Sequence, residues 1–303
     1  MALQTTGPIK ISEIKAELGS SSNSLRTLSA AAGFSTPDAM SEFYGYSSAP
    51  PVPDNPHYWR ADGVNDYVYG DWTYGNDLAI SSWSISVWIR QNQVNTASQQ
   101  FIDWNANPTI NGGNTDNRVM FNYNGSLNRL MLRIRTSRVN FDRQWALHDN
   151  SAVTGISSVA WNVNTRGNVN AAGWVHLVVT YDSTQSNAAN ALKLYWNGSE
   201  LTNQAAANSG GRTPVSFPAL ALGASIHNIG GGNADIDMDE WAFYQGVLNP
   251  AEISALYNSG VIVHPEYLVP AGFVEKASFN PNDIETAGGV YGGTYSGGQV
   301  LNH

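Results

Sequence analysis

Four stretches of the chain place an aromatic ring beside planar polar side chains, which is the combination that saccharide recognition uses. Rings stack on the apolar faces of sugars, while amide, guanidinium and carboxylate groups exchange hydrogen bonds with the hydroxyls. Trp104 and Trp145 have the most polar neighbours, so we expect them to be the main stacking platforms. Taken singly, each ring is more often a core residue than a platform. The candidate saccharide-binding residues are Trp104, Asn107, Trp145, Trp161, Trp72 and Tyr74.

Oxygen ligands of the kind that Ca²⁺ prefers are frequent in this sequence. Asp62, Asp66 and Asp239 are the candidate metal ligands, although they lack the ordered spacing of a dedicated site. The alternative, which we favour, is that Asp62 and Asp66 serve a turn and that Asp239 serves the end of a strand. Calcium is the single cofactor that the sequence brings into consideration.

Composition and motifs exclude several other chemistries. The chain has no cysteine, so it has no disulfide, no cysteine-ligated metal and no thiol nucleophile. No phosphate-binding Gly-Lys-Ser/Thr loop, His-Glu-x-x-His motif or nucleophile elbow occurs. His176 stands between aliphatic residues of a predicted strand, which favours a packed, hydrogen-bonded histidine over a catalytic base.

Charge and hydropathy argue against two classes of partner, nucleic acids and membranes. There are 15 Lys and Arg against 24 Asp and Glu, with a formal net charge of −9, which argues against a nucleic-acid partner. No apolar run approaches the ~20 residues of a membrane-spanning helix, so we expect no membrane insertion. The N-terminus lacks the basic and apolar regions of a secretory signal.

The segment Gly173–Glu200 is the clearest structural signal in the chain. Residues 174–181 alternate between two faces with β-branched and aromatic residues on both, as in a strand covered on both sides. Residues 192–197 alternate in the same way. Asn197 and Gly198 then supply the positive φ values of a tight hairpin turn.

Short strand patterns continue over residues 58–260, with no long helical pattern between them. This predicts a mainly β fold, a two-sheet antiparallel jelly-roll sandwich, preceded by a small N-terminal α-helical segment. A closing helix is expected from the cap at Asn249 to Gly260. Residues 58–68 are predicted to form a strand, a turn and a strand, and the further predicted strands are 83–90, 119–123, 130–135, 159–163, 219–223 and 238–244.

Three further regions flank that sandwich. Residues 1–46 are predicted to form three short helices, capped by Ser12 and Ser24 and opened by Thr36. Residues 47–57 contain four prolines and are expected to be a semi-extended linker. Residues 261–303 are a Gly- and Tyr-rich C-terminal extension that we place outside the sandwich domain, with edge strands or packing against the sandwich expected for Val261 to Val274.

Three helices this short bury little apolar area, so residues 1–46 are expected to be completed by a partner protein or by copies of the chain. The residues predicted to make that contact are apolar: Ile14, Leu18, Leu25, Leu28, Met40, Phe43 and Tyr44. An ordinary helical cap on the β domain is the alternative.

This N-terminal segment resembles a module found at the start of bacteriophage virion proteins, particularly in phages of Bacteroidetes hosts. The resemblance rests on Ile11–Gly19, on Ser24 to Phe34 and on Pro37–Tyr46. In such proteins the module is followed by varied domains, as expected of an anchor to a particle. The resemblance therefore implies that other virion proteins are the partners of residues 1–46.

Residues 57–260 resemble the concanavalin A-like jelly roll, in its laminin G-like or pentraxin-like branch. Four blocks carry the likeness in order: 62–68, 84–89, 173–182 with 194–198, and 239–244 leading to 248–257. The pentraxin-like branch implies Ca²⁺ at a rim, but its ligand set cannot be assigned residue by residue. The fold hosts lectins, glycosidases and adhesion modules, so the likeness indicates the fold more strongly than the function.

Retaining glucanases of this same fold carry Glu-x-Asp-x-x-Glu on one strand, and Asp235, Asp237 and Glu240 approach that pattern. Asp235 is one methylene shorter than the first glutamate of the motif. The laminin G-like pattern fits the same residues and extends further, to Asn249 and Leu256. We therefore expect no enzymatic activity and assign no catalytic residue.

Together these features predict a bacteriophage virion structural protein, such as a fibre, a spike or a capsid decoration. It would display a lectin-like domain for adhesion to glycans of the host or its environment. A decoration protein that binds no sugar is the first alternative, and a glycoside hydrolase is the distant one. We expect a homo-oligomer such as a trimer, because fibres and spikes usually are, and a location in the virion after synthesis in the host cytoplasm.

Overall fold

The structure of the chain is a computed structural model. Its described residues are 3–4, 6–32, 34, 36, 38–44, 46, 57–71, 78–91, 98–107, 109, 117–124, 129–146, 174–202, 204–226, 233–277, 294–296 and 299–302. The chain divides into two compact units, Met1–Pro53 and Asp54–His303. The boundary falls inside the proline-rich segment 47–57, which lies outside the described residues except for His57.

The first unit contains three short helices: α1 (Ile11–Leu18), α2 (Leu25–Ala31) and the 3₁₀ helix η1 (Met40–Phe43). As predicted, Ser24 caps α2 and its Oγ accepts the N–H of Thr27. Gly19 ends α1 with a φ of 60°, in the left-handed region that glycine tolerates.

Two helix starts differ from the prediction. The N-cap of α1 is Lys10 rather than Ser12, and the Lys10 N–H donates to Glu13 Oε2 at 2.8 Å, which satisfies one of the groups at that end. The third helix does not open at Thr36. Ala39 has an extended backbone, with φ −136° and ψ 145°, so the helix begins at Met40 and is a single 3₁₀ turn.

The first unit has a small core of its own. Ile14, Leu28 and Phe43 are fully buried in it, and the rings of Phe34 and Tyr46 contact Phe43 edge-on at 5.1 and 5.7 Å between centroids. Aromatic edge contacts of this kind add to the stability gained by burial.

This core corrects part of the predicted anchoring set. Because Ile14, Leu28 and Phe43 are buried inside the unit, they hold it together and present no surface to a partner. Tyr44 is 43% exposed, and its hydroxyl donates to the Gly7 carbonyl oxygen. The remaining three predicted contacts are partly buried against the core: Leu18, Leu25 and Met40.

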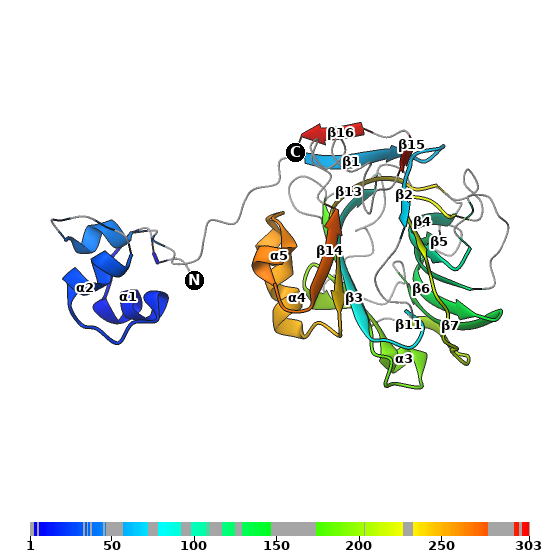
Figure 1. Cartoon of the computed structure of the whole chain (residues 1–303), viewed down its shortest axis with the longest axis horizontal. Coiled ribbons are helices and arrows are strands. Elements are labelled where there is room, and N and C mark those ends of the chain that lie inside the picture. Colours follow the sequence, from blue (N-terminus) through cyan, green and yellow to red (C-terminus); the bar gives the residue numbers. More distant parts are fainter. Residues whose placement is uncertain are drawn as a thin grey trace. The chain divides into compact units, whose positions relative to one another are not determined.

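The second unit is an antiparallel β-sandwich, as predicted (Figure 1). In the first sheet the strand order is β10 (Ser199–Glu200), β9 (Leu192–Trp196), β8 (Val175–Tyr181), β3 (Trp83–Gln91), β13 (Asp235–Gln245), β1 (His57–Asp62) and β16 (Gln299–Asn302), and β14 (Phe273–Ala277) also pairs with β13. The turn after β9 has φ values of 48° at Asn197 and 79° at Gly198, which confirms the predicted hairpin.

In the second sheet the strand order is β11 (Gln204–Ser209), β7 (Val139–Ala146), β6 (Arg129–Thr136), β5 (Arg118–Asn124), β4 (Ser98–Asn105), β12 (Ala219–Leu222), β2 (Tyr67–Asp71) and β15 (Thr294–Ser296). Strands β4, β7 and β11 were not anticipated, since their polar residues favour loops in the sequence. Three of the predicted strands, 119–123, 130–135 and 219–223, correspond to β5, β6 and β12. The predicted strand 159–163 lies outside the described residues.

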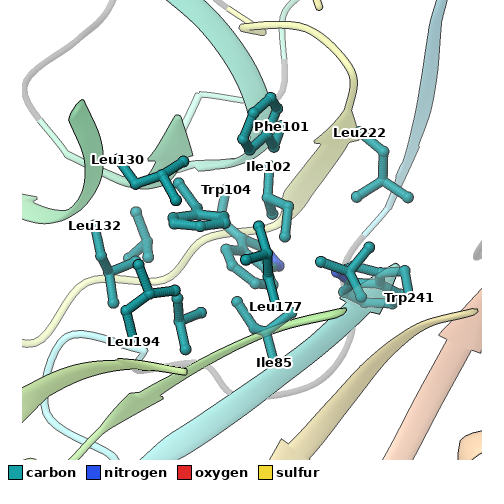
Figure 2. Close-up of a cluster of buried hydrophobic side chains, with 14 of the residues drawn as sticks. Ile85, Phe101, Ile102, Trp104, Leu130, Leu132, Leu177, Leu194, Leu222 and Trp241 are labelled. Atoms are coloured by element: carbon teal, nitrogen blue, oxygen red, sulfur yellow. The ribbon is translucent and has the colours of Figure 1, made fainter. Parts of the chain in front are cut away.

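The two sheets enclose one hydrophobic core. Figure 2 shows Trp104 in this core, with Ile85 and Leu177 of the first sheet on one side and Leu130 and Leu132 of the second sheet on the other. At ~25 cal/mol per Å² of buried apolar area, burying rings of this size is the main stabilisation of the sandwich.

Short helices cover the side of the first sheet that faces away from the second: α4 (Pro250–Tyr257) and α5 (Pro265–Leu268), which flank the turn η3 (Asn258–Gly260) (Figure 1). Ile253 and Leu256 of α4 pack against Ala242 and Tyr244 of β13. The predicted cap is confirmed, because Asn249 Oδ1 accepts the N–H groups of Ala251 and Glu252. The helix ends at Asn258, whose φ is 45°, and not at Gly260. A further short helix, α3 (Ala188–Ala191), precedes β9.

The placement of residues 261–303 outside the sandwich is corrected by the structure. β14 pairs with β13, β15 pairs with β2 and β16 pairs with β1, so the C-terminal region adds a strand to three places in the two sheets. Edge strands were expected for residues 261–274, and β14 begins in that range at Phe273. β15 and β16 were not expected, because glycine-rich segments carry little strand propensity. No helix among the described residues has the length and the apolar character needed to cross a bilayer.

Candidate functional site

The side of the second sheet that faces away from the core is polar. On β5, β6 and β7, residues such as Phe121, Leu132 and Phe141 face the core, and their neighbours along each strand therefore point the other way. We call this surface the polar face. Its polar members are Asp103, Asn105, Arg118, Asn122, Arg129, Arg133, Arg135, Asn140, Asp142 and Gln144. Met120 and Met131 alternate to the same side of β5 and β6 and are buried among them.

Burial divides the polar face into two parts. Asp103, Asn105, Arg118 and Asn122, on β4 and β5, are at most 6% exposed. The side chains on β6 and β7 are half-buried, except for Asp142, which is buried. The half-buried residues are Arg129, Arg133, Arg135, Asn140 and Gln144.

Two ion pairs order the polar face. Arg118 Nε lies 3.4 Å from Asp103 Oδ1, and Arg133 Nε lies 3.2 Å from Asp142 Oδ2 on the neighbouring strand. Asp103 Oδ2 also accepts the Ile226 N–H at 2.9 Å and the Ser225 hydroxyl at 3.0 Å. Burial raises the pKa of the Asp103 carboxyl, while Arg118 and these two hydrogen bonds act in the opposite direction.

Two amide oxygens of the polar face accept no hydrogen bond. Asn122 Oδ1 and Asn140 Oδ1 are both shielded from solvent and have no donor within reach. Asn122 itself is only 2% exposed. Buried acceptors are nearly always satisfied in folded proteins, so each of these oxygens is a place where a water or a ligand hydroxyl would be stabilised.

The two tryptophans that head the predicted saccharide-binding set lie in the core instead. Trp104 and Trp145 are 0% exposed and belong to the cluster between the sheets, which contradicts their assignment as stacking platforms. Both lie on strands, β4 and β7, where alternation turns them inward. The segment around Trp145 is part of β7, and Arg143 donates to the carbonyl oxygens of Ala189 and Leu192 at 2.7 Å.

The remaining members of that set are not brought together. Asn107 is half-buried, and its Oδ1 accepts the N–H of Thr109 at 3.0 Å, as in an Asx turn. The other three predicted residues lie outside the described residues: Trp161, Trp72 and Tyr74.

The predicted calcium ligands do not fit a cation site. Asp66 Oδ2 accepts the Asp62 N–H and Asp62 Oδ1 accepts the Val64 N–H, so these carboxylates serve a turn. Asp239 is buried in β13, where its Oδ1 accepts the Glu240 N–H at 2.8 Å. Across the described parts of the chain, no three His, Asp or Glu side chains gather into a group that could hold a metal.

The glucanase-like carboxylates lie on the first sheet, and two of them, Asp237 and Glu240, are engaged by basic side chains. Asp237 is 0% exposed and is bound by Arg60 at 2.7 Å and by Arg90 at 2.6 Å. Glu240 is 1% exposed and contacts His264, whose Nδ1 lies 2.9 Å from Glu240 Oε1. These contacts favour the expectation that the chain breaks no glycosidic bond.

His176 has the packed environment that its position predicted. Its Nε2 lies 2.8 Å from Ser86 Oγ, and its ring stacks near Trp88 and Tyr257, at 4.9 and 6.2 Å between centroids. Burial lowers its pKa to about 3, so the imidazole is neutral at physiological pH.

The sequence reasoning missed the polar face, although a signal for it was present. In the predicted strand 130–135, Arg133 and Arg135 alternate with Leu132 and Ile134. A strict period of two would have placed both arginines on the face opposite the core. The binding surface was expected at Trp104 and Trp145 instead.

Residues 62–254 match the family model of the concanavalin A-like lectin/glucanases superfamily. No curated protein matches the chain by sequence.

Several solved structures resemble the fold. A protein of Bacteroides ovatus ATCC 8483, assigned as carbohydrate-binding, is 12% identical with a TM-score of 0.49, over 82% of this chain and 60% of that one. The Ruminococcus gnavus sialidase module CBM40, bound to α2,3-sialyllactose, is 12% identical with a TM-score of 0.41, over 68% of this chain and 100% of the module. Domain 4 of the Geobacillus stearothermophilus arabinanase AbnA, in complex with arabinotriose, is 17% identical with a TM-score of 0.40, over 66% and 76%. At these scores the likenesses carry no argument about ligands.

Proposed function

Because the chain belongs to the concanavalin A-like lectin/glucanases superfamily, we propose that it binds saccharides and that the polar face is its binding surface. The observation that carries the proposal is the composition of that face. Amide, carboxylate and guanidinium groups lie on three adjacent strands: Arg133 of β6 stands directly opposite Asp142 of β7, and Asn122 is on β5. Such planar groups are the hydrogen-bonding partners that sugar hydroxyls require.

Binding without bond cleavage is the form of this function that the carboxylates support. A retaining glycosidase needs two accessible carboxyl groups about 5 Å apart. Asp237 and Glu240 are buried and engaged by Arg60, Arg90 and His264. We therefore propose a lectin-like module in which the glucanase-like motif has a structural role.

A glycan array with the purified full-length chain tests the proposal. It should include neutral and acidic saccharides, with and without EDTA. Asn140→Ala should weaken binding, because the half-buried Asn140 has an amide oxygen on the polar face that accepts no hydrogen bond. Asn190→Ala is the matched control, since Asn190 is exposed on α3. Absence of binding to every saccharide would overturn the function and favour a decoration protein that binds no sugar.

For the first unit we propose attachment to a bacteriophage particle, with other virion proteins as partners. The support is its resemblance to a virion module and its separation from the lectin-like unit as a compact body. The family match begins at residue 62, so the first unit lies outside it. In this proposal the protein resides in the virion and assembles as a homo-oligomer such as a trimer.

Deleting residues 1–53 tests the attachment. The truncated chain should keep a folded β-sandwich by circular dichroism and should be absent from purified particles. Incorporation at the level of the full chain would rule out the attachment role. Light scattering of both forms measures the oligomeric state.

A further inference from the structure

The polar face has an excess of positive charge, although the chain as a whole has a net charge of −9. Four arginines lie on β5 and β6, namely Arg118, Arg129, Arg133 and Arg135. The carboxylates that pair with them are Asp103 and Asp142. This surface thus carries more cationic than anionic side chains, which favours an anionic ligand.

Two of the arginines have no carboxylate partner among the described residues. Arg129 donates to the neutral Gln144 Oε1 at 3.3 Å. Arg135 is half-buried and its Nε, which is shielded from solvent, has no hydrogen-bond acceptor. An arginine that is partly removed from water and has no acceptor can bind an incoming anion at a low desolvation cost.

Positive charges lie close together around Arg135. Arg135 stands directly opposite Arg118 in the register of β5 with β6. The pKa of Arg118 is lowered, chiefly by burial and further by the positive charges of Arg133 and Arg135, although Asp103 counteracts this. A ligand carboxylate beside Arg135 would relieve that repulsion.

Two acceptors without a hydrogen bond lie near these two arginines, Arg129 and Arg135. Asn140 is opposite Arg135, and Asn122 lies on β5 between the positions opposite Arg135 and Arg129. Both have an amide oxygen that accepts no hydrogen bond. Arg129 and Arg135 are six residues apart on one strand, which corresponds to ~20 Å. This distance exceeds a single sugar ring and suits an extended chain.

Resting on the proposed saccharide function, we propose that the polar face is specific for polysaccharides that carry carboxylates, as in uronic acids. Arg135 and Arg129 bind successive carboxylates, and the half-buried Asn140, opposite Arg135, accepts a hydroxyl group. The bidentate geometry of the guanidinium group matches a carboxylate, which distinguishes this binding from attraction to any polyanion.

The test uses the full chain and four probes: polygalacturonate, its fully methyl-esterified form, dextran and dextran sulfate. Titration calorimetry should show binding to polygalacturonate and a loss of about tenfold or more on esterification. Binding to dextran or the methyl ester as tight as to polygalacturonate would overturn the specificity and leave the proposed function intact. Binding to none of the four, together with an empty glycan array, would overturn both. Dextran sulfate bound more tightly than polygalacturonate would indicate general polyanion attraction and also overturn the specificity.

Variants distinguish recognition of a carboxylate by the guanidinium group from attraction by net charge alone. Arg135→Gln and Arg129→Gln should each weaken binding of polygalacturonate about tenfold. Arg135→Lys keeps the charge and loses the planar fork, so it should also weaken binding. Arg26→Gln, in the first unit, makes the same change in net charge at an exposed pair with Asp38 and should leave binding unchanged. An Arg135→Lys variant that binds like the parent, with a native circular dichroism spectrum, would contradict the proposal.

Discussion

His264 Nδ1 lies 2.9 Å from Glu240 Oε1, and this contact joins the residue before α5 to the middle of β13. Glu240 has a φ of 45°, at the point where the register of β13 with β3 shifts between Asp239 and Ala242. A non-glycine residue in the left-handed region inside a strand persists only where its surroundings hold it there. The contact with His264 is one such restraint, and it connects the C-terminal segment to the sandwich.

A double-mutant cycle measures that restraint. His264→Ala leaves the Glu240 carboxylate buried without this contact, so we expect a loss of about 1–3 kcal/mol in the free energy of unfolding. In the background of Glu240→Gln the same substitution should cost less, because no buried charge is left behind. Urea unfolding of the four proteins gives the coupling. Equal costs of His264→Ala in both backgrounds would show that the two side chains are not coupled.

Because of Asp239, we expect the free energy of unfolding to fall as pH rises, which is the opposite of the effect of a carboxylate held in an ion pair. Burial, and then the charge of Glu240, raise its pKa well above 3.8. Between pH ~4 and the raised pKa, the folded state holds a proton that the unfolded state has lost, so the free energy of unfolding falls as pH rises. Asp239→Asn removes this proton and keeps an Oδ1 acceptor for the Glu240 N–H. We expect the variant to lose less stability than the parent across this window.

Thermal unfolding from pH 4 to pH 9 checks the Asp239 prediction. The matched control is Asp237→Asn on the same strand, because Asp237 is paired with Arg60 and Arg90. Loss of that charge should destabilise the protein by leaving two cations without their partner. Parallel pH profiles for Asp239→Asn and the parent would contradict the assignment of the raised pKa.

The sequence predicted the sandwich well because its strands are covered on both faces. Strong alternation in 83–90 and 174–181 located β3 and β8. The alternation pattern did not predict β4 and β7, because Gln99, Asp103 and Asp142 in these strands are polar yet buried. Their burial depends on partners from neighbouring strands, such as Arg118 of β5 for Asp103 of β4, and one-dimensional patterns do not show such pairs. The alternation of residues 130–135 does indicate the polar face, but its ion pairs exist only after the strands are in register.

His176 gives an opposite pH dependence at lower pH. Burial lowers its pKa from the ordinary value of 6.5 to about 3. Between those two values the unfolded state binds a proton that the folded state excludes, so the free energy of unfolding rises with pH up to about 6.5 and is then constant. We expect the His176 Hε1 resonance to be invariant between about pH 5 and pH 8. A titration midpoint near 6.5 would show that the imidazole is not buried as described.

Trp104 provides the sharpest contrast between a core role and a binding role. It is 0% exposed, and its ring lies 5.9 Å from Trp83, 6.0 Å from Phe243 and 6.4 Å from Trp241 between centroids. Trp104→Ala removes a large buried side chain and leaves a cavity, so we expect a loss of about 3–5 kcal/mol in the free energy of unfolding. Trp104→Phe should cost less, because it keeps most of the ring contacts.

Saccharide binding by the same variants tests the other role. At a temperature where Trp104→Phe is fully folded, its affinity for any bound saccharide should equal that of the parent, because the ring faces the core and not the ligand. Arg135→Gln should show the reverse pattern, with weaker binding and a small change in stability. Loss of binding in folded Trp104→Phe, with its free energy of unfolding unchanged, would indicate that Trp104 contacts the saccharide. It would contradict the place of Trp104 in the core.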